Sequence, residues 1–243
     1  MALIQMNMYS SALTTATTVN IVVPLENNAR KKYPVVWLLP PFGMDYTAWL
    51  RNTGIEHIAE KYNFIAAMPS LSHSFGVDMA HGLKYYTMLQ KELPLLLAEY
   101  FPVNLAKQYI VGIREGGYAA LRTALLNDDF YRAALTIGCG SITDEDFDIE
   151  KQKYILNAFG NKEISKLKNT NYDLTMLLDK AEGSNTKFYL AYGFYDNYKK
   201  SILELSKHIK DTNIKILEKC SSWKECEKAL GWFLKEMDVT LKH

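Results

Sequence analysis

Apolar and polar residues alternate along the first two segments of the chain, and continuous apolar runs follow them. The alternation covers residues 3–9 and 17–23 and predicts two half-buried antiparallel strands. Later apolar segments predict further strands, at 33–39, 64–68, 108–111, 133–137, 187–192 and 213–217. Helical spacing of apolar residues predicts the elements between them, at 55–62, 82–98, 115–126, 197–209 and 223–237.

Strands that alternate with helices in this way are typical of βαβ units. We therefore expect an α/β fold, a three-layer sandwich with a mostly parallel central sheet, in one domain over residues 1–243. Pro94 lies inside the predicted helix 82–98 and is expected to kink it. Residues 143–180 are charged and carry few strand signals, which predicts a helical excursion above the sheet.

Composition narrows the class of protein. An apolar fraction of 48% is enough for a large core, and 28 basic residues nearly balance 27 acidic ones. That balance argues against a general nucleic-acid or membrane-surface role, because both require a basic face. Cys139, Cys220 and Cys226 form no disulfide or metal pattern, so we expect reduced thiols, no metal and no cofactor. The chain begins with no signal-peptide pattern and has no apolar run of about 20 residues, so we expect a cytoplasmic protein.

One stretch carries the candidate chemistry: Tyr109-Ile-Val-Gly-Ile-Arg-Glu-Gly-Gly-Tyr-Ala-Ala-Leu121. It predicts a buried strand, a tight glycine-flanked turn and a helix. Hydrolases with a nucleophile elbow place G-x-S-x-G at such a junction, with the serine at its strained tip. Gly112 and Gly116 keep the spacing, but the tip residue is Arg114, which cannot attack a carbonyl. We expect the strained backbone to persist because the flanking glycines remain.

Several stretches resemble one family, the esterase D and S-formylglutathione hydrolase group, and most closely its small bacterial tributyrin esterases. The resemblance covers nearly the whole chain and implies an α/β-hydrolase fold with a Ser-Asp-His triad. Its most specific part is Ser74-Phe-Gly-Val-Asp-Met-Ala-His-Gly-Leu-Lys-Tyr-Tyr86. Further agreement lies in Met1-Ala-Leu-Ile-Gln-Met-Asn7, Tyr33-Pro-Val-Val-Trp-Leu-Leu39, Trp49-Leu-Arg-Asn-Thr53, Glu92-Leu-Pro94, Gly116-Gly-Tyr-Ala-Ala-Leu121 and Phe159-Gly160.

The same resemblance implies that the catalytic triad is incomplete. The serine position falls on Arg114, and the acid position falls on Asp196, which is retained. The family's histidine precedes a tryptophan, and here Ser221 stands in that place, before Trp223. Acyl transfer by a serine requires a base within hydrogen-bond reach, so the family mechanism is not available to these residues.

The loop that would form the oxyanion hole is also altered. Pro40 and Pro41 replace the His-Gly pair that the family carries after the 33–39 strand. Pro41 has no N–H to donate, although the amides of Phe42 and Glu115 could still bind a developing negative charge.

Two arrangements remain open for Arg114. It could pair with Asp196 and fill the former active site, since both belong at the same end of the sheet, or it could extend into solvent or pair with Glu115. Because Arg114 begins a helix, it could also help to bind a small anion.

A relocated serine mechanism has little support from the sequence. Five histidines are available: His57, His73, His81, His208 and His243. Ser70, Ser72, Ser74 and Ser141 lie near enough in this fold class to be considered, but neighbours such as Ser72 and His73 seldom orient each other correctly.

The sequence therefore supports two functions. The first is an esterase-family protein without serine-esterase activity that acts by binding or assembly, with a small anionic or ester-like ligand, as a homo-oligomer or as a subunit that regulates an active relative. The second is a carboxylic-ester hydrolase with weak or altered activity through a non-standard site.

Overall fold

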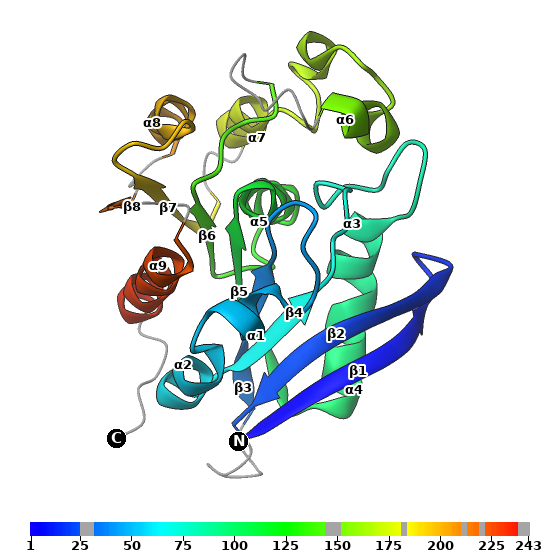
Figure 1. Cartoon of the computed structure of the whole chain (residues 1–243), viewed down its shortest axis with the longest axis vertical. Helices are drawn as coiled ribbons and strands as arrows, with labels where there is room; N and C mark the ends of the chain where they lie inside the picture. Colours follow the sequence, from blue (N-terminus) through cyan, green and yellow to red (C-terminus); the bar gives the residue numbers. More distant parts are fainter. Residues whose placement is uncertain (25–31, 144–151, 181–183, 210–212, 219–221, 238–243) are drawn as a thin grey trace.

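One eight-stranded sheet forms the centre of the molecule. In the computed structural model, residues 1–24, 32–143, 152–180, 184–209, 213–218 and 222–237 are described (Figure 1). The strands are β1 (Ala2–Ser10), β2 (Thr15–Val23), β3 (Tyr33–Leu39), β4 (Ile65–Pro69), β5 (Val103–Ile113), β6 (Ala133–Ile137), β7 (Lys187–Gly193) and β8 (Asn213–Leu217). Their order in the sheet is β1-β2-β4-β3-β5-β6-β7-β8. Pairing is antiparallel from β1 to β4 and parallel from there to β8, as the apolar runs predict.

Helices cover both faces of the sheet. They are α1 (Ala48–Asn52), α2 (Ile55–Tyr62), α3 (Tyr85–Thr87), α4 (Leu93–Tyr100), α5 (Glu115–Leu126), α6 (Gln152–Phe159), α7 (Leu174–Lys180), α8 (Lys199–Lys207) and α9 (Trp223–Glu236). Figure 1 shows α8 on one side of the β6–β8 end of the sheet and α9 on the other. This confirms the predicted three-layer α/β sandwich. The prediction of a single domain remains a prediction, although all eight strands belong to one sheet.

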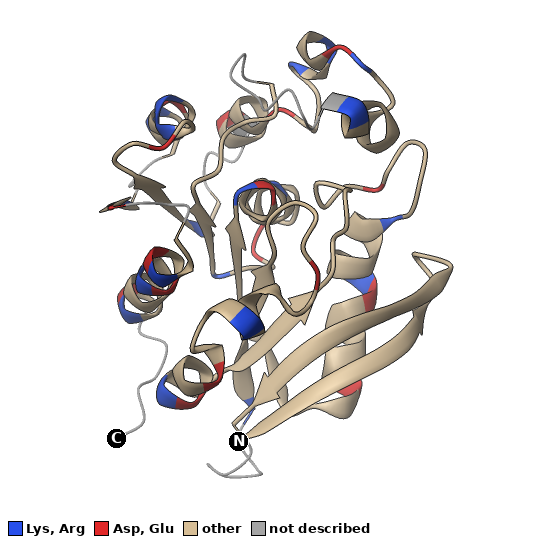
Figure 2. Ribbon diagram, in the orientation of Figure 1, with Lys and Arg blue, Asp and Glu red and all other residues tan. Residues whose placement is uncertain are grey.

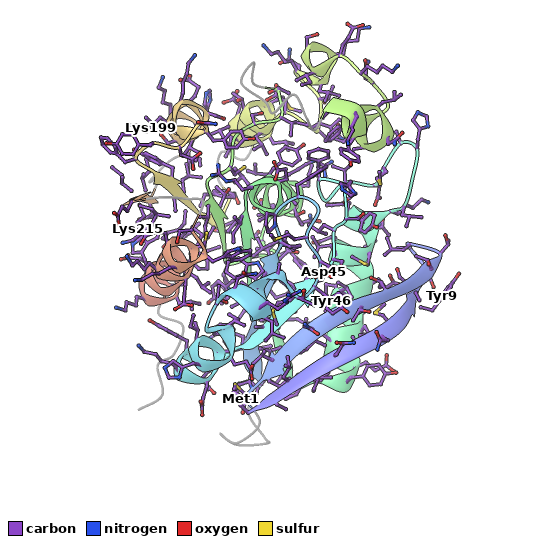
Figure 3. The ribbon with its side chains drawn as sticks, viewed as in Figure 1. Met1, Tyr9, Asp45, Tyr46, Lys199 and Lys215 are labelled. Atoms are coloured by element: carbon purple, nitrogen blue, oxygen red, sulfur yellow. The ribbon has the colours of Figure 1, made fainter. Side chains whose placement is uncertain are left out.

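The core lies where the parallel strands are covered on both faces. Nearly every residue of β3, and all residues of β4 and β6, are buried, which explains why their sequences are continuous apolar runs. The Nε1–H of the fully buried Trp37 donates to Oε1 of Gln108 at 3.1 Å, so the indole nitrogen does not lose its hydrogen bond on burial. By contrast β1 alternates between exposed and partly buried positions, and the exposed Tyr9 lies at the far tip of the β1–β2 ribbon (Figure 3).

The structure corrects the predicted helix 82–98. The helix begins only at Tyr85, because Lys84 forms a β-bridge with Asp78 and the Asp78 carboxylate accepts the N–H of Thr87 at 2.8 Å. A π-helical turn, Met88–Glu92, then precedes α4. Pro94 has no N–H to donate to the carbonyl of Gln90, so one α-helical hydrogen bond is lost there. The π-helical turn lies at this point, where the sequence predicted a kink.

The described part of residues 143–180 carries helices joined by turns and no strand, as predicted. They contain α6, a short 3₁₀ helix at Ile164–Leu167, and α7. The five-residue helix α1 was not predicted, because its sequence is too short for a helical period to show.

Charged residues are dispersed rather than gathered. Figure 2 shows basic and acidic residues interspersed along the outer helices, while β1 and β2 carry neither. No helix in the described part of the chain is long and apolar enough to cross a membrane.

Candidate functional site

The turn between β5 and α5 has the backbone of a nucleophile elbow. Arg114 sits at its tip with φ 55° and ψ −120°, a conformation that is strained for any residue with a side chain. Its N–H donates to the carbonyl of Ile137 at 2.9 Å, and its carbonyl accepts the N–H of Tyr118 at 3.0 Å. These bonds join the turn to β6 and to the first turn of α5, so the predicted strained turn is present.

Close packing explains why glycines flank the tip. A Cβ at Gly112 would lie 1.9 Å from the carbonyl oxygen of Gly116, and a Cβ at Gly116 would lie 2.3 Å from the carbonyl oxygen of Pro40. No other residue fits at either position without moving the backbone. The glycines therefore hold the start of α5 against β5 and against the loop that follows β3.

Arg114 and Asp196 form an ion pair. Nη1 of Arg114 lies 2.8 Å from Oδ1 of Asp196 and also donates to the carbonyl of Gly138 at 3.2 Å. The guanidinium lies 5.5 Å from the centre of the Tyr198 ring, within the range of a cation–π interaction. Of the two arrangements open from the sequence, the structure has the ion pair.

The two partners differ in their exposure to solvent. The Arg114 side chain is 25% exposed and the Asp196 side chain is 0% exposed. Oδ1 of Asp196 accepts a second hydrogen bond, from the N–H of Tyr198 at 3.0 Å, whereas the buried Oδ2 has no partner in the described structure. Within the described residues, Arg114 is therefore the cation that compensates the buried Asp196 carboxylate.

The oxyanion loop is engaged by a neighbouring carboxylate. The N–H of Phe42 donates to Oε2 of Glu115 at 3.3 Å, and the Glu115 side chain is buried at the start of α5. The carbonyl of Pro41 accepts the N–H of Met44 at 3.2 Å, which closes a turn in the loop. The sequence predicts that the backbone amides of Phe42 and Glu115 could bind an oxyanion. It does not predict that the Glu115 side chain accepts the Phe42 N–H.

An aromatic group adjoins this loop. The Phe42 ring contacts His73, Phe75 and Tyr154, with centroid separations of 4.7, 5.0 and 5.1 Å. The rings of His73 and Tyr154 stack in parallel at 4.3 Å. The Phe42 ring thus packs against the loop after β4 and against α6, and it cannot turn toward Arg114 without losing these contacts.

No serine of the described chain has a well-placed histidine. Oγ of Ser72 lies 3.5 Å from Nδ1 of His73, at the outer limit of a hydrogen bond. The Oγ atoms of Ser70, Ser74 and Ser141 bond to backbone groups or to a threonine instead.

The other described histidines are exposed or contact residues other than Arg114. His57 and His81 are exposed, and Nδ1 of His208 lies 2.7 Å from Oδ1 of Asp179 on α7. The His73 ring stacks on Tyr154, and His243 lies outside the described residues.

The thiol of Cys226 lies near the ion pair but is poorly suited to nucleophilic chemistry. Burial raises the pKa of Cys226 to about 12, and the nearby positive charge of Arg114 opposes that shift only in part. Cys139 and Cys226 are both buried and carry reduced thiols. Ser221 and Cys220 lie outside the described residues.

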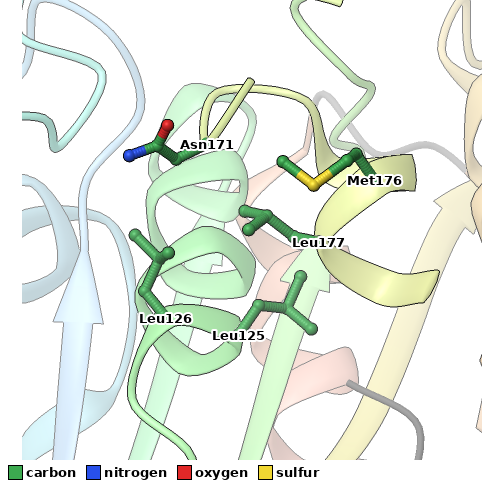
Figure 4. A pocket seen from close by; sticks show the side chains of 5 residues that line it. All are labelled: Leu125, Leu126, Asn171, Met176 and Leu177. Atoms are coloured by element: carbon green, nitrogen blue, oxygen red, sulfur yellow. The ribbon is translucent and has the colours of Figure 1, made fainter. Parts of the chain in front are cut away.

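A surface depression lies at the other end of α5. It has a volume of about 470 Å³ and is lined by Leu125, Leu126, Asn171, Met176 and Leu177, and Figure 4 shows Leu125 of α5 on the side of Leu177 of α7. Leu125 follows Arg114 by three helical turns, about 16 Å along the axis. The depression is therefore separate from the elbow. No cluster of His, Cys, Asp or Glu in the described ranges could hold a metal ion.

The sheet, its helices and the elbow make up an α/β-hydrolase fold, and comparison with solved structures agrees. Among the similar structures are *Staphylococcus aureus* FphF, a fluorophosphonate-binding serine hydrolase (TM-score 0.84, 22% identity, 98% of both chains), and the S-formylglutathione hydrolase FrmB from the same organism (TM-score 0.82, 23% identity, 98% of this chain and 99% of that one). *Mycobacterium tuberculosis* MPT51 is also similar (TM-score 0.82, 12% identity, 100% of both chains). At these identities the likeness shows the fold.

The sequence also matches the family model described as "Putative esterase" over residues 10–139, more than half of the chain. The chain belongs to this esterase family, which confirms the resemblance seen in its motifs. A curated relative, an acetyl esterase from *Caldicellulosiruptor saccharolyticus*, is 24% identical over 239 residues and covers 89% of each chain.

Proposed function

We propose that this member of the esterase family has lost serine-esterase activity and acts by binding or by assembly. The observation that carries the proposal is Arg114 at the elbow tip, paired with Asp196 at 2.8 Å. The side chain that would attack an ester is replaced by one that cannot, and it occupies the carboxylate that would orient a catalytic histidine.

The oxyanion loop supports the same proposal. Catalysis of acyl transfer needs N–H groups directed at the developing oxyanion, and the Phe42 N–H already bonds to the Glu115 carboxylate. A substrate oxygen would have to displace a negatively charged group that is held beside it. Even the residual rate that an oxyanion hole alone can supply, about 10³-fold over water in well-studied triads, is not expected here.

A short-chain p-nitrophenyl ester assay tests the proposal. We expect hydrolysis of p-nitrophenyl acetate and butyrate to equal the enzyme-free rate, in the wild type and in Arg114→Ala alike. The *Caldicellulosiruptor* acetyl esterase serves as the reference protein. Turnover well above background that disappears in Ser72→Ala or His73→Ala would instead support the second function, an ester hydrolase with a non-standard site.

Reversion of the triad asks whether the rest of the site would support catalysis. We expect Arg114→Ser with Ser221→His to remain silent, because the Glu115 carboxylate still bonds to the Phe42 amide. Adding Glu115→Ala to that pair should give the first measurable turnover. Full activity in the double variant would refute the role assigned to Glu115.

The role in place of catalysis is part of the proposal. A small anion or ester-like ligand, self-association, and regulation of an active relative are each consistent with an esterase scaffold that does not turn over. Analytical ultracentrifugation alone and with an active relative would separate the last two.

A further inference from the structure

The least satisfied polar atom at the elbow is Oδ2 of Asp196. The side chain is fully buried, Oδ1 accepts from Arg114 and Tyr198, and Oδ2 accepts from nothing in the described structure. A buried carboxylate oxygen without a donor is unfavourable, so it marks a position where a donor would bind.

The charges at the elbow favour a cationic donor over an anion. The Arg114 guanidinium is already engaged, because its Nη1 donates to Oδ1 of Asp196 and to the carbonyl of Gly138. Oδ2 of Asp196 is an acceptor, so an incoming anion would be repelled by this carboxylate, whereas a cation with an N–H group would pair with it.

The aromatic ring beside the ion pair favours a flat molecule. The Tyr198 ring already lies 5.5 Å from the Arg114 guanidinium and presents a face to a cation. The Arg114 side chain is 25% exposed and covers the fully buried Asp196, so a ligand would reach Oδ2 by entering beside Arg114.

We propose that the elbow binds a small planar cation of the amidine or imidazole class, whose N–H donates to Oδ2 of Asp196. The inference rests on the proposed function, since it assigns a ligand class to a site that no longer performs catalysis. It differs from the anionic ligand expected at Arg114 from the sequence, and the two alternatives can be distinguished directly.

The test titrates acetamidinium chloride into the whole protein and follows the backbone amide resonance of Tyr198, whose N–H bonds to Asp196. We expect a saturable shift with a Kd of about 1 mM, the range for a ligand of so few atoms. Tetramethylammonium chloride, a cation without N–H groups, should shift it at least about tenfold more weakly, and sodium acetate should not shift it.

Three variants locate the site. Asp196→Asn should weaken acetamidinium binding about tenfold, and Arg114→Ala should strengthen it about tenfold, because the probe then replaces the lost guanidinium. Asp179→Asn, which alters an exposed carboxylate paired with His208, should leave binding unchanged. If Asp196→Asn does not fold, the Arg114→Ala comparison decides.

Two results would overturn the inference: saturable binding of acetate at this amide, or acetamidinium binding that neither Asp196→Asn nor Arg114→Ala changes. Ester turnover is measured separately. Ester turnover together with acetamidinium binding would refute the proposed loss of activity and leave the ligand class standing. No turnover and no binding would refute the ligand class and leave the proposed loss of activity standing.

Discussion

Replacing Arg114 by alanine should destabilise the protein by removing the described ionic partner of a buried carboxylate. Breaking a buried ion pair by deleting one partner costs about 3–5 kcal/mol. Arg114 is 25% exposed and water can approach its place, so we expect the lower figure of about 2–3 kcal/mol. For a chain of 243 residues this corresponds to a fall in Tm of roughly 5–10 °C.

Backbone strain does not contribute to this difference. Alanine at φ 55° and ψ −120° is strained as arginine is, whereas glycine is not. Arg114→Gly should therefore be more stable than Arg114→Ala by about 1–2 kcal/mol, the cost of holding a side chain in this region. Urea unfolding followed by the fluorescence of the four tryptophans measures both differences.

A double variant distinguishes the charge from the contact. In Arg114→Ala the Asp196 carboxylate is buried without its cation, and Asp196→Asn removes that charge while keeping the shape. We expect the double variant to be at least about 1 kcal/mol more stable than Arg114→Ala alone. Additive losses would refute the reasoning, and so would a cost below about 1 kcal/mol for Arg114→Ala, the value typical of an exposed pair such as Glu163 with Lys166.

Two further predictions concern the elbow and its surroundings. Gly112→Ala should prevent folding or cost several kcal/mol, because the new Cβ would meet the carbonyl oxygen of Gly116 at 1.9 Å. The control is Gly231→Ala in α9, whose Cβ meets nothing within 4 Å and which should stabilise the protein by about 0.5–1 kcal/mol in the same unfolding assay. The Cys226 thiol, whose pKa is raised to about 12 by burial, should resist iodoacetamide at pH 8 in the native protein and react in urea, as peptide mass mapping would show. Because the thiol ionises at lower pH in the unfolded chain, its contribution to stability is present below about pH 8.5 and is lost as the pH rises toward 12.

The fold could be predicted closely because its signals are local. Strand β3, strand β6 and helix α2 begin and end where apolar runs and helical spacing place them. The predictions were less accurate where a side chain outside the periodic segment fixes an end, as Asp78 does for the helix that starts at Tyr85. A periodic pattern carries no information on such a contact.

The site could be predicted only in part. The motif spacing located the elbow and showed that Arg114 holds its tip, and the shared end of the sheet made Asp196 a plausible partner. The sequence could not decide which way a long arginine side chain turns, and the structure turns it inward, toward a buried carboxylate. The bond from the Phe42 amide to the Glu115 side chain was not predictable, because it depends on how two loops meet.

The loss of the serine nucleophile is the central claim, and covalent labelling tests it most directly. A fluorophosphonate forms a stable adduct with any serine that a neighbouring base activates, wherever in the chain that serine lies. Intact-mass spectrometry after incubation with an excess of the reagent should show the unmodified mass for this protein and one adduct for FphF, which is described as fluorophosphonate-binding. A single stoichiometric adduct on this protein, on Ser72 or on any other serine, would contradict the account.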